Sequence, residues 1–127
     1  FFGKRQFPMS DTSLTINVEH MKRVTVVTVS GRVDSSNAAE LDNTLKEIMN
    51  DGKYNIVLNL SDVSYMSSAG LRALVSALRE CKKHRGNVCL SEPSERVAEV
   101  LDLAGLTVAE APLFQVYEDD TTAVGSF

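Results

Sequence analysis

Serine hydroxyls are the side chains whose arrangement in this sequence suggests chemistry. Three of them, Ser64, Ser67 and Ser68, fall within the stretch Asp62-Val63-Ser64-Tyr65-Met66-Ser67-Ser68-Ala69-Gly70-Leu71. A serine can act as a nucleophile beside a general base, as a cap before a helix, or as a phosphate acceptor where it is exposed. The stretch contains no histidine, the most common catalytic base. We therefore expect a cap or a phosphate acceptor.

The residues on either side of the serines predict a turn between a strand and a helix. Ile56–Leu60 is a short apolar run typical of a buried strand, and Leu71, Leu74, Val75 and Leu78 recur at helical spacing. Ser67 or Ser68 then becomes the N-cap. No acidic residue lies between Ser67 and Arg79, so the positive end of the helix dipole has no carboxylate beside it and would favour a phosphate on Ser68. Taken alone, the local pattern is more typical of a simple cap.

Composition limits the classes of function. The chain has 127 residues and a formal net charge of −4, which argues against nucleic acid or an anionic membrane as a partner. The basic cluster at 82–85 is interpreted as a solvated helix C-terminus. No apolar run is long enough to insert into a membrane. Cys81 and Cys89 have no metal-site spacing, and we expect both to be reduced in the cytoplasm.

Hydrophobic patterning predicts a single α/β domain over residues 9–127, preceded by residues 1–8 as cloning-derived or unstructured sequence. The expected order is ββαβαβαβ with a short final helix, in a mixed, mostly parallel sheet of about five strands with helices packed on it. The expected strands are 14–19, 24–30, 56–60, 88–90 and 114–117. Four helices are expected. The first starts after a cap at Asp34, Ser35 or Ser36, the second after Ser67 or Ser68, the third after Ser94 and the fourth near Asp119. The buried face of the third helix is expected to hold Val97, Val100, Leu101 and Ala104.

Three loops follow strands in this order, at 31–36, 61–68 and 91–94. All three should lie at the carboxyl edge of the sheet, where α/β folds place their sites. This placement predicts that the polar side chains of the first two loops are neighbours: Asp34, Asp62, Ser64, Ser67 and Ser68.

With this order and this turn, the chain resembles the STAS domains of bacterial anti-sigma-factor antagonists. The motifs that carry the resemblance are Ser30-Gly31-Arg32-Val33-Asp34, the run from Ile56 to Met66, and Ser68-Ala69-Gly70-Leu71. It implies a STAS-type fold and a phosphoswitch at Ser68, with Gly70 in register. The unmodified protein would bind an anti-sigma factor that is also a serine kinase and so release the sigma factor; phosphorylation would break the complex and a protein phosphatase would restore it. The implied partner-binding residues are Asp34, Ser35, Asp62, Ser64, Ser67, Ser68, Gly70, Leu71 and Arg72.

One position departs from the family pattern. Many phosphorylated members carry an aspartate just before the acceptor, where this chain has Ser67. Ser67 is therefore a rival acceptor, and the departure favours an alternative function as a scaffold subunit of a stress-signalling assembly or a phospholipid-transport ABC system. Structural roles also remain open for individual residues: Leu71 in the core, Arg72 on a solvated helix face, and the two aspartates in turns or caps.

An enzyme is the third class considered. The turn lacks the first glycine of G-x-S-x-G, and the only histidines, His20 and His84, lie in a predicted hairpin turn and at the far end of the central helix. No phosphate-binding loop, dinucleotide fingerprint or metal cluster is present. We therefore expect no catalysis, no cofactor and no metal.

Overall fold

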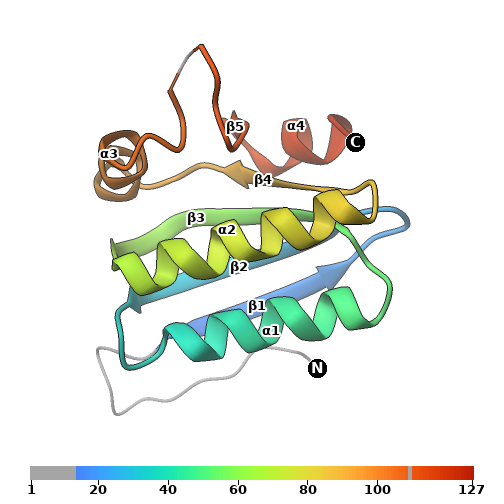
Figure 1. Ribbon diagram of the computed structural model, residues 1–127, viewed down its shortest axis with the longest axis horizontal. Helices are drawn as coiled ribbons and strands as arrows, with labels where there is room; N and C mark the ends of the chain where they lie inside the picture. Colours follow the sequence, from blue (N-terminus) through green and yellow to red (C-terminus); the bar gives the residue numbers. More distant parts are fainter. Residues whose placement is uncertain (1–13, 109) are drawn as a thin grey trace.

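The computed structural model describes residues 14–108 and 110–127. Strands and helices follow one another in the predicted order, including the short final helix (Figure 1). The elements are β1 (Thr15–His20), β2 (Thr25–Val33), α1 (Ala38–Asn50), β3 (Asn55–Met66), α2 (Ser68–Lys83), β4 (Asn87–Ser91), α3 (Glu95–Leu103), β5 (Val116–Tyr117) and α4 (Asp120–Gly125).

The strands form one sheet in the order β1-β2-β3-β4-β5. β1 and β2 pair antiparallel as a hairpin, and every later pair is parallel. Parallel neighbours need a crossover connection, which α1, α2 and α3 provide in turn. The prediction of a mixed, mostly parallel α/β sheet is confirmed.

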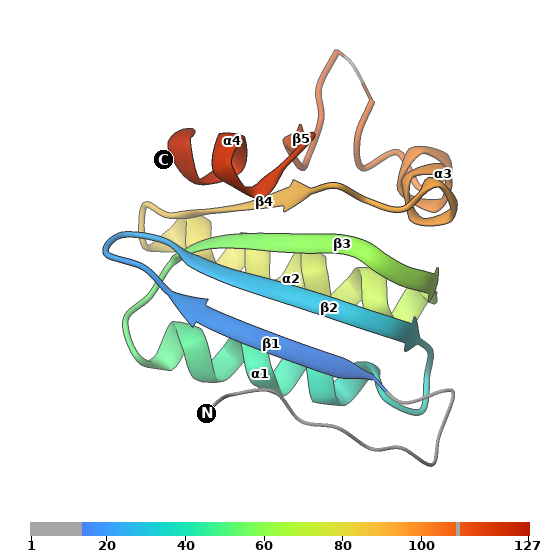
Figure 2. The ribbon, with the colours of Figure 1, turned by 180° about the vertical axis from the view of Figure 1, so that it is seen from behind.

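Helices α1 and α2 lie side by side on one face of the sheet (Figure 1), and Figure 2 shows the strands in front of them from the other side. Between these helices and the sheet lies the main core, in which Leu41, Leu45, Leu58, Leu74 and Leu78 are almost fully buried. α4 covers part of the opposite face, where Ala123 packs on Val24, Val26 and Val57. The first turns of α1 and α2 therefore rest on a rigid core at the carboxyl edge of the sheet.

Two strands extend further than the sequence predicted. β3 continues through Asp62 and Ser64 to Met66, and β2 continues through Gly31 to Val33, where we expected loops. The polar residues in these segments resembled a loop, yet Val63 and Met66 are buried on the core side. The two extensions pair with each other across shifts in register, and this pairing keeps the backbone extended.

Two further details differ from the prediction, and the predicted cap of α3 agrees with it. In α3 the buried face is narrower than expected, because Val100 is only half-buried and Ala104 is exposed beyond the end of the helix. Ser94 does cap α3 by accepting the Val97 N–H, at 3.3 Å. Gly52 stands just beyond α1 at φ +82°, a conformation that glycine adopts without strain.

The described residues show neither a membrane-spanning helix nor a metal site. No helix among them is long and apolar enough to cross a bilayer. No group of three His, Cys, Asp or Glu side chains within residues 14–108 and 110–127 is arranged to hold a metal ion.

Candidate functional site

The ends of β2 and β3 bring the candidate residues together. The Ser67 N–H donates to the Val33 carbonyl, at 2.8 Å, so Ser67 and Asp34 leave the sheet from adjacent points. α2 starts at Ser68 and α1 starts four residues after Asp34, and both first turns lie on the left side of Figure 1. The site is therefore built on strand ends and helix starts rather than on long loops.

Ser67 and Ser68 have different roles at the start of α2. Ser67 is the N-cap, and its hydroxyl accepts the Gly70 N–H at 3.2 Å while its carbonyl accepts the Leu71 N–H at 3.0 Å. Its side chain is half-buried. Ser68 is the first helical residue and is exposed, and the first turn of α2 carries no acidic side chain. Of the two hydroxyls, only that of Ser68 is both exposed and free of the cap.

Gly70 is buried where α2 crosses the strand ends. A Cβ atom at this position would lie 2.4 Å from Met66 Sδ and 2.7 Å from Val33 Cγ1. Both distances are below van der Waals contact, so a side chain here would push α2 away from β2 and β3. The glycine two residues after Ser68 therefore fixes how closely the first turn of α2, and Ser68 with it, sits against the sheet.

The loop between β2 and α1 is held by Asp34, but not in the predicted way. The N-cap of α1 is Asn37, whose side chain makes no capping bond; the expectation of a cap at Asp34, Ser35 or Ser36 is wrong. Asp34 instead folds the loop into a turn, because its carboxylate accepts the Ser36 N–H at 2.9 Å and the Ser36 hydroxyl at 2.6 Å. Ser35 stands exposed at its tip.

These bonds also set the charge of Asp34. The Ser36 hydroxyl, and after it the Ser36 backbone N–H, stabilise the carboxylate, which lowers the pKa of Asp34 below its ordinary value of 3.8. Asp34 is therefore ionised at neutral pH and places a negative charge in the loop that leaves β2, next to the Val33 carbonyl that accepts the Ser67 N–H.

Asp62 and Ser64 lie on extended strand rather than in the predicted loop. Asp62 pairs with Ser30, and at about 3.3 Å per residue it stands roughly 13 Å along β3 from Met66. The Ser64 hydroxyl reaches the Gly31 carbonyl at 3.5 Å. The expectation that Asp62 neighbours Ser68 is therefore wrong: its charge lies on a different part of this edge.

A groove runs along α2 from Ser68, and we call it the α2 groove. It has a volume of about 740 Å³ and is lined by Ser68, Leu71, Arg72, Val75, Ser76, Arg79, Glu80, Lys83, Ala104 and Leu106. Leu71 is half-buried and Arg72 exposed. Arg72 also lines a hollow shared with Ser35 between α1 and α2, so it connects the loop after β2 with the groove.

Sequence reasoning named Ser68, Leu71 and Arg72 but missed the rest of the groove. Val75 belongs to the apolar residues at helical spacing, yet it is only half-buried, and Arg79 was not among the predicted site residues. Leu106 joins them from beyond α3. The number of basic residues on α2 was a signal that could have drawn attention to this face.

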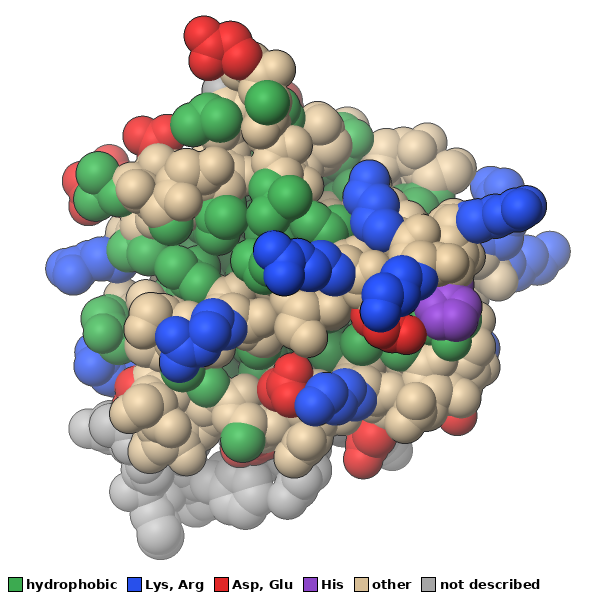
Figure 3. Space-filling model, viewed as in Figure 1, with side chains coloured by type: hydrophobic (Ala, Val, Ile, Leu, Met, Phe, Trp, Pro, Cys, Tyr) green, Lys and Arg blue, Asp and Glu red, His purple; other side chains and the backbone are tan. Residues whose placement is uncertain are grey.

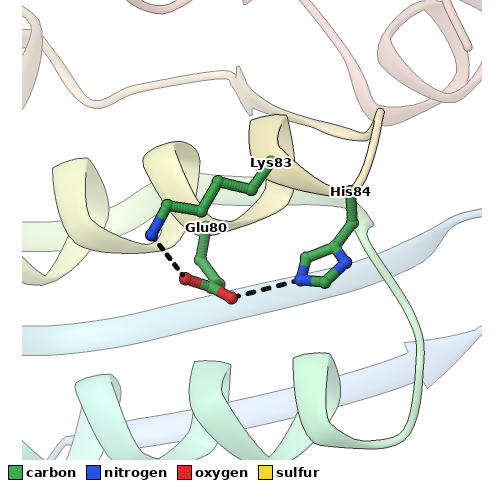
Figure 4. Close-up of polar contacts among 3 residues, drawn as sticks. All are labelled: Glu80, Lys83 and His84. Atoms are coloured by element: carbon green, nitrogen blue, oxygen red, sulfur yellow. Dashed lines mark hydrogen bonds and ion pairs between the residues drawn. The ribbon is translucent and has the colours of Figure 1, made fainter.

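Neither histidine lies near Ser68. His20 Nδ1 contacts the Thr25 hydroxyl at 3.1 Å, at the opposite end of β2 from Val33. His84 follows the last turn of α2, where its ring stacks on Tyr54 with centroids 4.0 Å apart and its Nε2 contacts Glu80 at 3.2 Å (Figure 4). The 16 residues of α2 separate it from Ser68 by about 24 Å. Neither ring can deprotonate Ser68 in this fold.

The described chain is thus a small α/β domain with an exposed serine at the start of its central helix. The model of the STAS domain family matches residues 15–119, and the chain belongs to this family.

Proteins similar to this chain include anti-sigma factor antagonists. An anti-sigma-B factor antagonist from Staphylococcus epidermidis is 32% identical over 80 residues, which cover 63% of this chain and 74% of the relative. The crystal structure of an anti-sigma factor antagonist from Mycobacterium paratuberculosis is similar with a TM-score of 0.80 and 26% identity, covering 92% of this chain and 96% of that one. The resemblance to the anti-sigma-factor antagonists is thereby confirmed.

The fold is also that of SpoIIAA, an anti-sigma factor antagonist whose structure is known in an unphosphorylated form. The TM-score is 0.75 with 20% identity, and the match covers 87% of this chain and 94% of that one. SpoIIAA from Bacillus is known in a phosphorylated form as well, with a TM-score of 0.69 and 19% identity over 87% of this chain and 97% of that one. At these identities the likeness shows the shared fold.

Proposed function

We propose that this protein is an anti-sigma-factor antagonist that works by binding and not by catalysis. In its unmodified form it binds an anti-sigma factor that is also a serine kinase, and it thereby frees a sigma factor. Phosphorylation of Ser68 breaks the complex, and a protein phosphatase restores it. The names of its relatives from Staphylococcus epidermidis and Mycobacterium paratuberculosis support the binding role.

The observation that carries the switch is the division of roles between the two serines. Ser67 is half-buried and its hydroxyl caps α2, whereas Ser68 is exposed and no residue in the first turn of α2 is acidic. A kinase can reach Ser68 without unfolding the helix start. A phosphate there carries a charge of about −1.5 to −2 and is stabilised by the dipole of α2.

The same phosphate would weaken a complex formed at this edge of the sheet. It adds a second negative group beside the ionised Asp34, and a partner pressed against the first turn of α2 would have to remove water from it. Repulsion between the phosphate and Asp34 acts in the free protein as well, whereas the cost of removing water from the phosphate, and repulsion from acidic groups of the partner, arise only in the complex. No change of fold is needed for such a switch.

Phosphate mapping and partner capture test this proposal. The protein would be incubated with ATP and a lysate of its native host, and peptide mass mapping would be compared for wild type, Ser68→Ala and Ser67→Ala. We expect one phosphate, which is lost in Ser68→Ala and kept in Ser67→Ala. Immobilised wild type should retain an anti-sigma factor with kinase activity, and Ser68→Glu should not.

Three outcomes contradict the proposal in different ways. A phosphate on Ser67 would support a phosphorylation switch but show that Ser67, and not Ser68, is the modified residue. Binding of the anti-sigma factor that is unchanged by Ser68→Glu would refute the switch. An unphosphorylated protein that co-purifies with a transporter ATPase would favour the scaffold function, which Ser67 in place of the family's aspartate already supports.

A further inference from the structure

α2 concentrates positive charge in a protein that is negative as a whole. The helix holds four of the chain's 13 basic residues and only one of its 17 acidic residues. That acidic residue, Glu80, contacts Lys83 Nζ at 3.7 Å and His84 Nε2 at 3.2 Å (Figure 4). Among the described residues, Arg72 and Arg79 form no ion pair. The α2 groove therefore presents two arginines to a partner.

Apolar side chains accompany these arginines. Leu71, Val75 and Leu106 are partly buried and line the groove. The far wall of the groove is formed by Ala104 and Leu106. Five large hydrophobic side chains are exposed in the described part of the chain, and four of them lie between 103 and 116, in the same segment as Leu106 but outside the groove lining; Leu103 is 82% exposed. Figure 3 shows hydrophobic side chains gathered between α2 and this segment, with Lys and Arg along α2. Exposed apolar surface of this kind marks interaction sites.

The spacing of the lining residues indicates the shape of the partner. They recur every three or four residues along α2, from Ser68 to Lys83, so the groove is about as long as the helix. Arg72 and Arg79 are two turns apart, about 10 Å along the axis. The single head group of a lipid or a free anion can engage one of them, whereas a helix with acidic residues two turns apart can engage both.

We propose that the α2 groove binds an acidic amphipathic helix of a partner protein. The apolar stripe of that helix would cover Leu71, Val75 and Leu106, and its acidic edge would lie along Arg72 and Arg79, a helix-in-groove mode of recognition. The assignment of this helix to the anti-sigma factor rests on the proposed function. Ser68 stands at one end of the groove, one turn before Arg72, so a phosphate on Ser68 would compete with the acidic helix for that arginine.

A designed peptide tests the groove directly. The probe is a fluorescently labelled amphipathic helix about as long as α2, with leucines along one face and glutamates along one edge; the control peptide has lysines in place of the glutamates. Binding would be measured by fluorescence anisotropy, and the contacted residues by amide chemical shifts. We expect the acidic peptide to bind, to perturb the residues lining the groove, and to bind at least about tenfold more tightly than the basic one.

Charge variants of α2 supply the matched comparison. Arg79→Glu should weaken binding of the acidic peptide at least about tenfold. Lys82→Glu makes the same change of charge on an exposed residue of the same helix that does not line the groove, and it should change binding by less than about threefold. Val75→Asp should weaken binding without preventing folding, as circular dichroism would show, because Val75 is only half-buried.

Several outcomes would overturn the inference. These are absence of binding, equal binding of both peptides, or equal losses in Arg79→Glu and Lys82→Glu. Self-association that Arg79→Glu abolishes, seen by sedimentation, would assign the groove to a second copy of the chain. Arg79-dependent binding to phosphatidylglycerol vesicles without binding to the peptide would assign it to a lipid surface.

The inference and the proposed function can fail separately. If the peptide binds as described but Ser68→Glu leaves anti-sigma-factor binding unchanged, the groove proposal is supported and the switch is refuted. If Ser68→Glu abolishes anti-sigma-factor binding while Arg79→Glu changes neither that binding nor the binding of the peptide, the switch is supported and the groove proposal is refuted.

Discussion

Replacing Gly70 with alanine tests whether close contact between α2 and the sheet holds Ser68 in place. In an unhindered helix this change would stabilise the protein by up to about 1 kcal/mol, because alanine is the better helix former. Here the new Cβ would lie 2.7 Å from Val33 Cγ1 and 2.4 Å from Met66 Sδ. The Met66 side chain is flexible, but Val33 is β-branched and fully buried and cannot rotate away.

Overpacking of this kind costs about 1–3 kcal/mol. After the gain in helix propensity, we expect Gly70→Ala to lower the free energy of unfolding by about 1 kcal/mol, which is roughly 3–5 °C in Tm for a domain of this size. Urea unfolding followed by far-UV circular dichroism would measure it, with unchanged m values confirming that two-state analysis applies.

Two comparisons separate crowding from a general effect of losing glycine. Gly125→Ala, in α4, places its Cβ in open space and should leave stability unchanged or slightly raised. In a double-mutant cycle, Val33→Ala should relieve the clash, so that Val33→Ala with Gly70→Ala costs less than the sum of the single changes by at least about 0.5 kcal/mol. An additive cycle, or a Gly70→Ala variant as stable as Gly125→Ala, would refute the reasoning.

Three more predictions follow from the same contacts. Ser67→Ala removes the acceptor for the Gly70 N–H and should lower the free energy of unfolding by about 1 kcal/mol; equal urea midpoints for variant and wild type would rule the cap out. The Asp34 carboxyl, with its pKa lowered by Ser36, should titrate by NMR below 3.8 and move upward in Ser36→Ala. Because its folded pKa is depressed, it stabilises the fold above its ordinary pKa, and this contribution disappears as the pH falls through the folded value. Burial raises the pKa of Cys81 to about 11 and also raises that of Cys89, so neither thiol should react with a disulfide reagent at neutral pH until urea unfolds the protein; prompt reaction of the folded protein would contradict this.

The order of elements could be predicted from the sequence because each element has a strong local signal. The helical spacing from Leu71 to Leu78 and the apolar run from Ile56 to Leu60 do not depend on distant residues. The last part of β3, in contrast, depends on distant residues. Asp62 and Ser64 are polar residues typical of a loop, and they form a strand only because this segment pairs with the end of β2. The start of α1 is similar, because Asp34 uses its carboxylate for the Ser36 turn and leaves Asn37 as the cap.

The site was predictable in part for the same reason. Ser67, Ser68 and Gly70 belong to one continuous turn, so their sequence spacing determines their geometry. The α2 groove could not be found in this way, because its far wall comes from Ala104 and Leu106, more than 30 residues after Ser68 in the sequence. A pattern within one helix shows which of its faces is apolar, but not what stands opposite that face.

Ser67 shows how the structural and electrostatic roles of one position can be separated. An aspartate here would cap α2 and also add a negative charge beside Ser68. Ser67 keeps the cap through its hydroxyl, at 3.2 Å from the Gly70 N–H, and leaves the charge out. Asp34 remains a negative group on the described strand ends, next to the Val33 carbonyl that accepts the Ser67 N–H. A phosphate on Ser68 would meet less repulsion within the free protein and stand one turn from Arg72. The phosphate would therefore weaken binding mainly through the contact with the partner. An acidic partner would have to remove water from a phosphate that is stable in the free protein, and this desolvation would lower the affinity.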